Sequence, residues 1–328
     1  MRKLIIDADT GSDDAVALLM AYRNLSESEI LGVSLVSGNV PLNQAILNTI
    51  YVNELCEVNI PIHKGASKPL ERDYIEVHES EEANKIALSY QNTSTSAQHV
   101  HGVDGLGDIG LRPSTEKISD VSALDFHKKI LSEETDVEIV TLGPLTNIAK
   151  LVLDSPELLK NIKHCYIMGG SSNAFGNVTK FAEYNFWVDP EAADIVLNSG
   201  IPITVIGWDP SLLDAMIDED KVNEIEKIGT KYSKFTNEIQ VVLREMIKDI
   251  FGHDGYDLPD PLAMSVFLDE EIIAEDVVAN IRVDTRDGMT RGGCVIDFFN
   301  LEPEAEKVRI VQRCHQDMFY NLLKKSLN

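Results

Sequence analysis

The chain has 328 residues, of which 44% are hydrophobic and 25% are charged, a composition typical of a globular protein that is long enough to bury a sizeable core. Its 54 Asp and Glu residues outnumber 29 Lys and Arg residues, for a formal net charge of -25. Such a surface repels phosphate backbones and anionic lipids, so we expect neither nucleic acid nor a membrane as a partner.

The lengths of the apolar runs and the spacing of the cysteines indicate the cellular compartment. The apolar run in the first residues, MRKLIIDADTG, is too short for a secretion signal, and no run in the sequence reaches the ~18 apolar residues of a membrane span. Four widely spaced cysteines form no CxxC pair, which favours reduced, buried thiols. We therefore expect a cytoplasmic protein.

Short runs rich in β-branched residues alternate with segments of helical period along the first two thirds of the chain. The predicted strands are 3–6, 30–36, 137–141, 164–168 and 202–206, and the predicted helices are 13–24, 41–56, 120–134, 144–153 and 190–199. Strands that alternate with helices indicate an α/β fold. We predict an open, mostly parallel, Rossmann-like sheet flanked by helices, with the functional site at the C-terminal ends of the strands.

The remaining segments have weaker sequence patterns. Residues 71–98 are polar and charged, which predicts an insertion or mobile loop beside the site. Residues 218–251 predict one or two amphipathic helices, and the alternating patterns near 276–284, 294–299 and 307–312 predict further strands before a terminal helix. No linker divides the chain, so we expect one domain over residues 1–328.

An acidic cluster follows the first predicted strand. Asp7, Asp9, Asp13 and Asp14 fall within eight residues and lead into an apolar helix. Carboxylates this close in a half-buried loop repel one another unless a cation neutralises them. Oxygen donors without Cys or His favour Ca²⁺ or Mg²⁺ over zinc. Helix capping is the alternative explanation, but it accounts for Asp13 and Asp14 only.

A second acidic stretch lies far along the chain, at Asp257-Leu258-Pro259-Asp260-Pro261. It begins another apolar helix and could complete the coordination of a metal. An ordinary helix start, with Asp260 as the cap and proline after it, explains the same residues. The two interpretations stay open on this stretch alone.

Short motifs occur in a fixed order along nearly the whole chain. The first is Asp-x-Asp-x-Gly-x-Asp-Asp-Ala, from Asp7 to Ala15. The others are Gly38-Asn39, His101-Gly102, Gly143-Pro144-Leu145-Thr146-Asn147, Met168-Gly169-Gly170, Gly176-Asn177, Ala182-Glu183-Tyr184-Asn185, Asp189-Pro190-Glu191-Ala192-Ala193 and Asp260-Pro261. Together they resemble the motifs of the inosine-uridine-preferring nucleoside hydrolases.

The resemblance implies a Ca²⁺-dependent enzyme that hydrolyses the N-glycosidic bond of ribonucleosides to free base and ribose. It implies a metal site formed by Asp9, Asp14, Asp260 and the main-chain carbonyl of Leu142, with Asp9 as the general base for a bound water. The residues implied for the ribose hydroxyls are Asp13, Asn177, Glu183, Asn185 and Asp260, with the main chain of Met168, while Asn39 and Asp7 support these groups. A homodimer or homotetramer is also expected.

The residues that would contact the base depart from the family pattern. In the nonspecific branch of the family a His precedes the metal-binding Asp, and in the purine-specific branch a Trp stands there, but this chain has Pro259. His101 matches another family His near the base. The other local candidates for protonating the leaving base or binding it are His253, Tyr256, Asp254 and Tyr184. The base specificity stays open.

Two alternative functions compete with this one. Asp7-Ala8-Asp9-Thr10 after a strand is similar to the motif of haloacid-dehalogenase-type phosphatases, in which Asp7 would be the nucleophile. That chemistry does not explain Asp13, Asp14 or the Asp260 region. The second alternative is a noncatalytic protein that binds ribose and Ca²⁺ on the same scaffold, and release of free base distinguishes it from a hydrolase.

Overall fold

The computed structural model describes residues 2–71, 97–173, 176–252 and 254–328. Nine strands in these residues form one sheet in the order β10-β9-β11-β6-β5-β4-β1-β2-β3. They are β1 (Leu4–Ala8), β2 (Ile30–Leu35), β3 (Ile62–Lys64), β4 (Val137–Thr141), β5 (Ile162–Met168), β6 (Ile203–Ile206), β9 (Ile273–Val283), β10 (Cys294–Asp297) and β11 (Val308–Cys314). A separate antiparallel pair consists of β7 (Met216–Asp218) and β8 (Gly255–Asp257).

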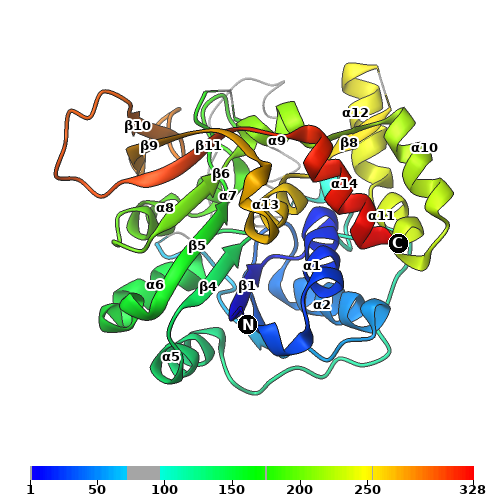
Figure 1. Cartoon of the computed structure of the whole chain (residues 1–328), viewed down its shortest axis with the longest axis horizontal. Coiled ribbons are helices and arrows are strands. Elements are labelled where there is room, and N and C mark those ends of the chain that lie inside the picture. Colours follow the sequence, from blue (N-terminus) through cyan, green and yellow to red (C-terminus); the bar gives the residue numbers. More distant parts are fainter. Residues whose placement is uncertain (1, 72–96, 174–175, 253) are drawn as a thin grey trace.

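Helices surround this sheet (Figure 1). They are α1 (Ser12–Asn24), α2 (Leu42–Cys56), α4 (Gln98–His101), α5 (Ala123–Glu133), α6 (Thr146–Asp154), α7 (Tyr184–Val188), α8 (Pro190–Leu197), α9 (Trp208–Asp214), α10 (Glu219–Ile228), α11 (Lys231–Glu238), α12 (Val241–Phe251), α13 (Pro259–Leu268) and α14 (Gln316–Leu327). None of the described helices is both long and apolar enough to cross a membrane.

The sheet separates two hydrophobic cores. Successive side chains of a strand point to opposite faces, so Leu4 and Ile6 of β1 pack with α1, α2, α13 and α14, whereas Ile5 packs with α5, α6 and α8. Figure 1 shows these two groups of helices on opposite sides of the strands. Burial on both faces explains why β1, β4 and β6 are buried at every position and have nearly continuous apolar sequences.

The sheet is mostly parallel, as predicted. Every neighbouring pair from β3 to β11 is parallel, and β9 and β10 add an antiparallel edge. The chain proceeds from β1 to β2 and β3 in one direction and from β4 to β5 and β6 in the other. The order therefore reverses between β1 and β4, and ligand sites of such sheets form at the strand ends beside this reversal.

The predicted strands and most predicted helices are confirmed with shifts of a few residues at their ends. Residues 218–251, predicted as one or two helices, contain three. Gly229, with φ of 74°, ends α10, because a left-handed residue cannot continue a right-handed helix and glycine adopts it without strain. The second break lies at Ile239 and Gln240, between α11 and α12. The insertion predicted at 71–98 lies almost entirely outside the described residues.

Candidate active site

Asp9 lies at the reversal point, immediately after β1. Its Oδ2 accepts a hydrogen bond from the main-chain N–H of Asn39 at 2.6 Å, and its Oδ1 accepts one from the Asn39 side chain at 3.3 Å. A Cβ atom at Gly38 would lie 1.9 Å from Asp9 Oδ2, and one at Gly143 would lie 2.8 Å from Asp9 Oδ1. The carboxylate therefore fits its position only because glycine follows both β2 and β4.

Asp14 is held by three donors at the start of α1. Its carboxylate accepts hydrogen bonds from the main-chain N–H groups of Gly11 at 2.9 Å and Asp9 at 3.2 Å, and from Asn39 Nδ2 at 3.0 Å. Asn39 thus bonds to two acidic side chains at once.

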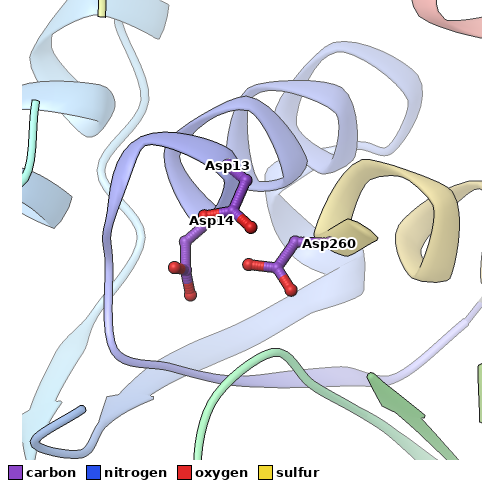
Figure 2. Close-up of side chains that lie close together, drawn as sticks. All are labelled: Asp13, Asp14 and Asp260. Atoms are coloured by element: carbon purple, nitrogen blue, oxygen red, sulfur yellow. The ribbon is translucent and has the colours of Figure 1, made fainter. Parts of the chain in front are cut away.

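Three carboxylates meet where the first turns of α1 and α13 face each other. Asp13, Asp14 and Asp260 each offer one oxygen within 4.8 Å of the other two, and all three residues are buried. Figure 2 shows the three side chains pointing into a common space. Asp9, expected among the metal ligands, is not a member of this compact group, since its carboxylate is turned toward Asn39.

Carboxylates that are buried close together have a raised affinity for protons or for a cation. Burial is the largest cause that raises the pKa of Asp9, Asp13, Asp14 and Asp260, and neighbouring carboxylates raise it further for Asp9, Asp13 and Asp260. Within the described chain no Lys or Arg pairs with these four groups, and Asp13 Oδ1 and Asp260 Oδ2 have no hydrogen-bond partner there. An all-oxygen donor set of this charge fits a hard divalent cation.

Asn185 connects the ends of β4 and β5. Its Nδ2 donates to the carbonyl oxygen of Leu142 at 2.8 Å and to that of Met168 at 3.2 Å. Leu142, expected to provide a metal ligand, therefore presents its carbonyl to an amide that the sequence assigned to ribose binding. The two predicted sites lie directly beside each other.

Glu183 caps the first turn of α7 and is also part of this region. It accepts main-chain hydrogen bonds from Asn185 at 2.9 Å and from Gly170 at 2.8 Å. Burial raises its pKa to about 7, although these hydrogen bonds lower it. A cap carboxylate that is buried rather than solvated is costly to keep charged, and this favours a role beyond capping.

The structure does not bring every predicted residue into this group. Asn177 is exposed in the loop between β5 and α7. Tyr256 is fully buried, and its hydroxyl donates to Asn237 at 2.8 Å. Asp254 forms an ion pair with Arg244 at 2.8 Å, which lowers its pKa. His253 lies outside the described residues.

His101 and Tyr184 lie close to the acidic groups. His101 Nδ1 is 3.7 Å from Asp13 Oδ1, and burial lowers the pKa of this His to about 3. The Tyr184 hydroxyl donates to the carbonyl oxygen of Gly38 at 2.7 Å. Both side chains therefore border the site, and the lowered pKa of His101 leaves its ring neutral at ordinary pH.

Asp7 lies below the site, inside the sheet. It is fully buried, and its Oδ2 accepts hydrogen bonds from Ser34 and, at 2.8 Å, from Asn147. A phosphatase nucleophile would have to face the substrate, so this position speaks against the phosphatase alternative. Sequence reasoning found no role for Asn147, Ser12 or Gln240, which bond to Asp7, His101 and Ser12, because their contacts arise from tertiary packing and leave no periodic signal in the sequence.

Proteins of similar sequence and structure have names that describe nucleoside-cleaving enzymes. A pyrimidine-specific ribonucleoside hydrolase of Photobacterium profundum, RihA, is 33% identical over 330 residues, which cover 99% of this chain and 98% of the relative. Uridine nucleosidase 1 of Arabidopsis thaliana is 35% identical over 266 residues, which cover 80% of this chain and 72% of the relative. A solved purine-preferring ribonucleoside hydrolase from Gardnerella vaginalis matches with a TM-score of 0.85 and 29% identity over 99% of this chain and 98% of that one.

The family described as inosine-uridine preferring nucleoside hydrolase matches residues 4–321. The match includes β1 with its acidic cluster, both cores and α13 with Asp260. Since it extends over nearly the whole chain, this protein belongs to the inosine-uridine preferring nucleoside hydrolases.

Proposed function

We propose that this protein hydrolyses the N-glycosidic bond of ribonucleosides and releases free base and ribose. One observation carries the proposal: the buried carboxylates of Asp13, Asp14 and Asp260 converge within 4.8 Å at the reversal point of the sheet. Such an arrangement is unstable by itself and is useful for holding a cation beside a substrate. Membership of the nucleoside hydrolase family supports this use of the site.

We propose Ca²⁺ as the cation, with Asp9, Asp14, Asp260 and the Leu142 carbonyl as its protein ligands. Asp14 and Asp260 belong to the compact acidic group, and Asp9 donates its main-chain N–H to Asp14. Bound Ca²⁺ would orient a water molecule and lower its pKa. All proposed donors are oxygen atoms, which is the donor chemistry that Ca²⁺ takes in proteins.

Asp9 is the proposed general base. Asn39 donates hydrogen bonds to both oxygens of its carboxylate. Gly38 and Gly143 lie so close to this carboxylate that it fits between them but cannot rotate. A water proton would be taken up on this carboxylate. Burial and the neighbouring Asp14 carboxylate raise the pKa of Asp9, which increases its affinity for a proton.

The proposed ribose contacts are Asp13, Asn177, Glu183, Asn185 and Asp260, with the main chain of Met168. Asn185 already bonds to the Met168 carbonyl, so the amide and this main chain face the same place. Buried groups that bond sugar hydroxyls stay unpaired when a hydroxyl is missing. We therefore expect ribonucleosides to be cleaved in preference to deoxyribonucleosides.

The base would lie on the side of His101. This His borders Asp13, and Pro259 offers no proton where other family members have a His. The relatives differ in the bases that their names state, one being pyrimidine-specific and one purine-preferring. The test must therefore include both kinds of base.

The test is release of free base and ribose from inosine, adenosine, guanosine, uridine and cytidine, each beside its deoxy form, with Ca²⁺ and without phosphate. We expect Asp9→Ala to abolish release. Asp214→Asn is the matched control, since Asp214 is also buried but pairs with Arg313 away from the acidic group. Bound Ca²⁺ without release from any nucleoside would overturn the hydrolase proposal and favour a noncatalytic ribose-binding protein.

The resemblance to the family also leads us to propose a homodimer or homotetramer. Light scattering of the purified protein measures its molar mass directly. A mass of one 36.4 kDa chain at micromolar concentration would contradict this proposal.

A further inference from the structure

A buried hydrogen-bond network joins three separate parts of the chain behind His101. Ser12 Oγ, at the start of α1, lies 2.9 Å from His101 Nδ1 and 3.0 Å from Gln240 Oε1. Gln240 Nε2 donates to the Ser12 carbonyl oxygen at 3.2 Å. Ser12 and Gln240 are fully buried and His101 nearly so, so water does not compete for these bonds.

The network restricts the position of each proton. The Ser12 carbonyl can only accept a hydrogen bond, so the amide of Gln240 must face it with Nε2. Gln240 Oε1 therefore faces Ser12 Oγ, and because Oε1 also only accepts, the single hydroxyl proton of Ser12 is directed to Gln240. Ser12 Oγ is left with lone pairs toward His101, and it can bond to Nδ1 only if Nδ1 carries the proton.

One contact favours the opposite arrangement. The main-chain N–H of Ser12 points at His101 Nδ1 at 3.3 Å, which suits an unprotonated Nδ1. This distance is longer than the 2.9 Å to Ser12 Oγ. In addition, Asp13 Oδ1 lies 3.7 Å from Nδ1 and has no hydrogen-bond partner in the described chain. A proton on Nδ1 can bond to Ser12 Oγ and is favoured by the charge of the nearby Asp13 carboxylate, so the balance favours that nitrogen.

We propose that Gln240 is a positioning residue that, through Ser12, keeps the proton of His101 on Nδ1 and leaves Nε2 as a hydrogen-bond acceptor. Nε2 makes no hydrogen bond to any residue that the structure describes. Its use in the reaction depends on the function proposed above, in which the base lies beside His101. An unprotonated Nε2 can accept a hydrogen bond from a ring N–H of the base, but it has no proton to donate to the base.

The elements that carry the network are packed so that Gln240 has little freedom. Gln240 lies at the break between α11 and α12. The preceding carbonyl, that of Ile239, would lie 2.8 Å from a Cβ atom at Gly107, and the Gly107 N–H donates to the His101 carbonyl at 2.8 Å. The turn that follows His101 is therefore in close contact with the helix break, which fixes the distance between the two side chains.

The tautomer of His101 can be measured without any turnover. In the full-length protein with ¹⁵N-labelled histidine, the ring-nitrogen chemical shifts distinguish protonated from unprotonated nitrogen, and His101→Gln identifies the signals. We expect Nδ1 to be protonated and Nε2 unprotonated at pH 7. A protonated Nε2 in the wild-type protein would overturn the proposal.

Two variants test the part played by the network. In Gln240→Met the Ser12 hydroxyl is free to donate to Nδ1. In Ser12→Ala the Oγ acceptor is lost, and the main-chain N–H at 3.3 Å is nearer to Nδ1 than Asp13 Oδ1 at 3.7 Å. Both variants should therefore move the proton to Nε2. Ser12→Thr keeps the hydroxyl and should keep the wild-type tautomer. Ser211→Ala is the control, because its buried hydroxyl donates to the carbonyl oxygen of Gly207, the residue before α9, and takes no part in the network. An unchanged tautomer in both Gln240→Met and Ser12→Ala would contradict the role of Gln240.

Kinetics then connect the tautomer with the base. Inosine presents a ring N–H where adenosine presents a lone pair, so both variants should lower the ratio of kcat/KM for inosine over adenosine about tenfold, the effect of one hydrogen bond. A purely structural defect would lower both values equally. If no nucleoside is cleaved by the wild-type protein, the proposed function fails while the chemical shifts still decide the tautomer.

Discussion

At the scale of single residues, the site is governed by repulsion among acidic side chains. Asp13, Asp14 and Asp260 are buried together and pair with no Lys or Arg among the described residues, whereas the buried Asp214 pairs with Arg313 and the buried Glu138 with Arg2. An isolated group of this kind is retained only where a ligand offsets the repulsion. The acidic group is therefore a place where stability and function oppose each other.

Replacing one member of the group should stabilise the metal-free protein. Asp260→Asn removes a charge that has only acidic neighbours, so we expect the free energy of unfolding in a chelator to rise by on the order of 1 kcal/mol. The same variant should lose the stabilisation that Ca²⁺ gives the wild-type protein, since it lacks a ligand. Urea denaturation with and without Ca²⁺ measures both effects.

The matched control for this prediction is Asp214→Asn. Asp214 is as deeply buried as Asp260 but accepts hydrogen bonds from Arg313 and from the main chain of Cys314. We expect this change to lower the free energy of unfolding by on the order of 1 kcal/mol and to leave the Ca²⁺ effect intact. If both variants were destabilised in the chelator, repulsion would not be the main force in the acidic group.

At the scale of elements, the residues that follow three strands surround the proposed general base, Asp9. β1 delivers Asp9, β2 is followed by Gly38 and Asn39, and β4 is followed by Gly143. The carboxyl ends of adjacent parallel strands lie side by side, so these residues meet although about 130 positions separate the first from the last. The two glycines are needed for space, not for an unusual backbone angle.

A methyl group at Gly38 should displace Asp9. Its Cβ would lie 1.9 Å from Asp9 Oδ2, and we expect Gly38→Ala to lower kcat at least about 100-fold, the cost of moving a catalytic group by roughly 1 Å. Gly229→Ala is the control: this glycine has φ of 74° at the end of α10, and a Cβ there would meet only the Lys227 carbonyl oxygen, at 3.9 Å. It should lose stability but keep its activity, and equal losses of activity in both would contradict the steric argument.

The strands of the parallel sheet could be predicted from the sequence because burial on both faces leaves long apolar runs. β3, with three residues, and the pair of β7 and β8 were missed, since such short elements give no period. The acidic cluster and Asp260 were also predicted from the sequence. Other features depend on tertiary packing, which no local pattern encodes. They are the orientation of Asp9 toward Asn39, the burial of Tyr256 and the network through Gln240.

At the scale of the whole molecule, acidity acts in two places. The surface side chains that give the net charge of -25 repel one another. Salt at 0.1 M screens this repulsion between charges more than about 10 Å apart. The buried carboxylates are different, because salt does not reach them. Their raised pKa values make the folded state bind more protons than the unfolded chain, and this difference appears as a dependence of stability on pH.

Burial raises the pKa of Glu183 from 4.5 to about 7, that of Asp7 from 3.8 to about 7 and that of Asp257 from 3.8 to about 6. A carboxyl group whose folded-state pKa is raised favours the folded state below its unfolded pKa, and this advantage is lost as the pH rises through the folded pKa. These carboxyl groups should therefore lower the stability of the metal-free protein progressively between pH 4 and about 7, whereas His101 and His127, whose pKa burial lowers to about 3, act in the opposite direction over the same range. The loss should persist at high salt, because only the surface repulsion is screened.

Ca²⁺ should oppose this loss. At pH 8 the acidic group is charged and binds the cation most tightly, so a concentration 100-fold above Kd should raise the free energy of unfolding by about 2.7 kcal/mol, whereas near pH 5 protons compete for the same oxygens and the gain should shrink. Asp7→Asn should flatten the slope measured in a chelator, since it removes a buried titrating group that has no part in holding the metal. Urea denaturation at several pH values, with chelator and with Ca²⁺, measures these slopes. A slope between pH 4 and 7 that Asp7→Asn leaves unchanged would show that this buried carboxyl does not keep its proton in the folded state, and would contradict the electrostatic argument made for the buried acidic groups.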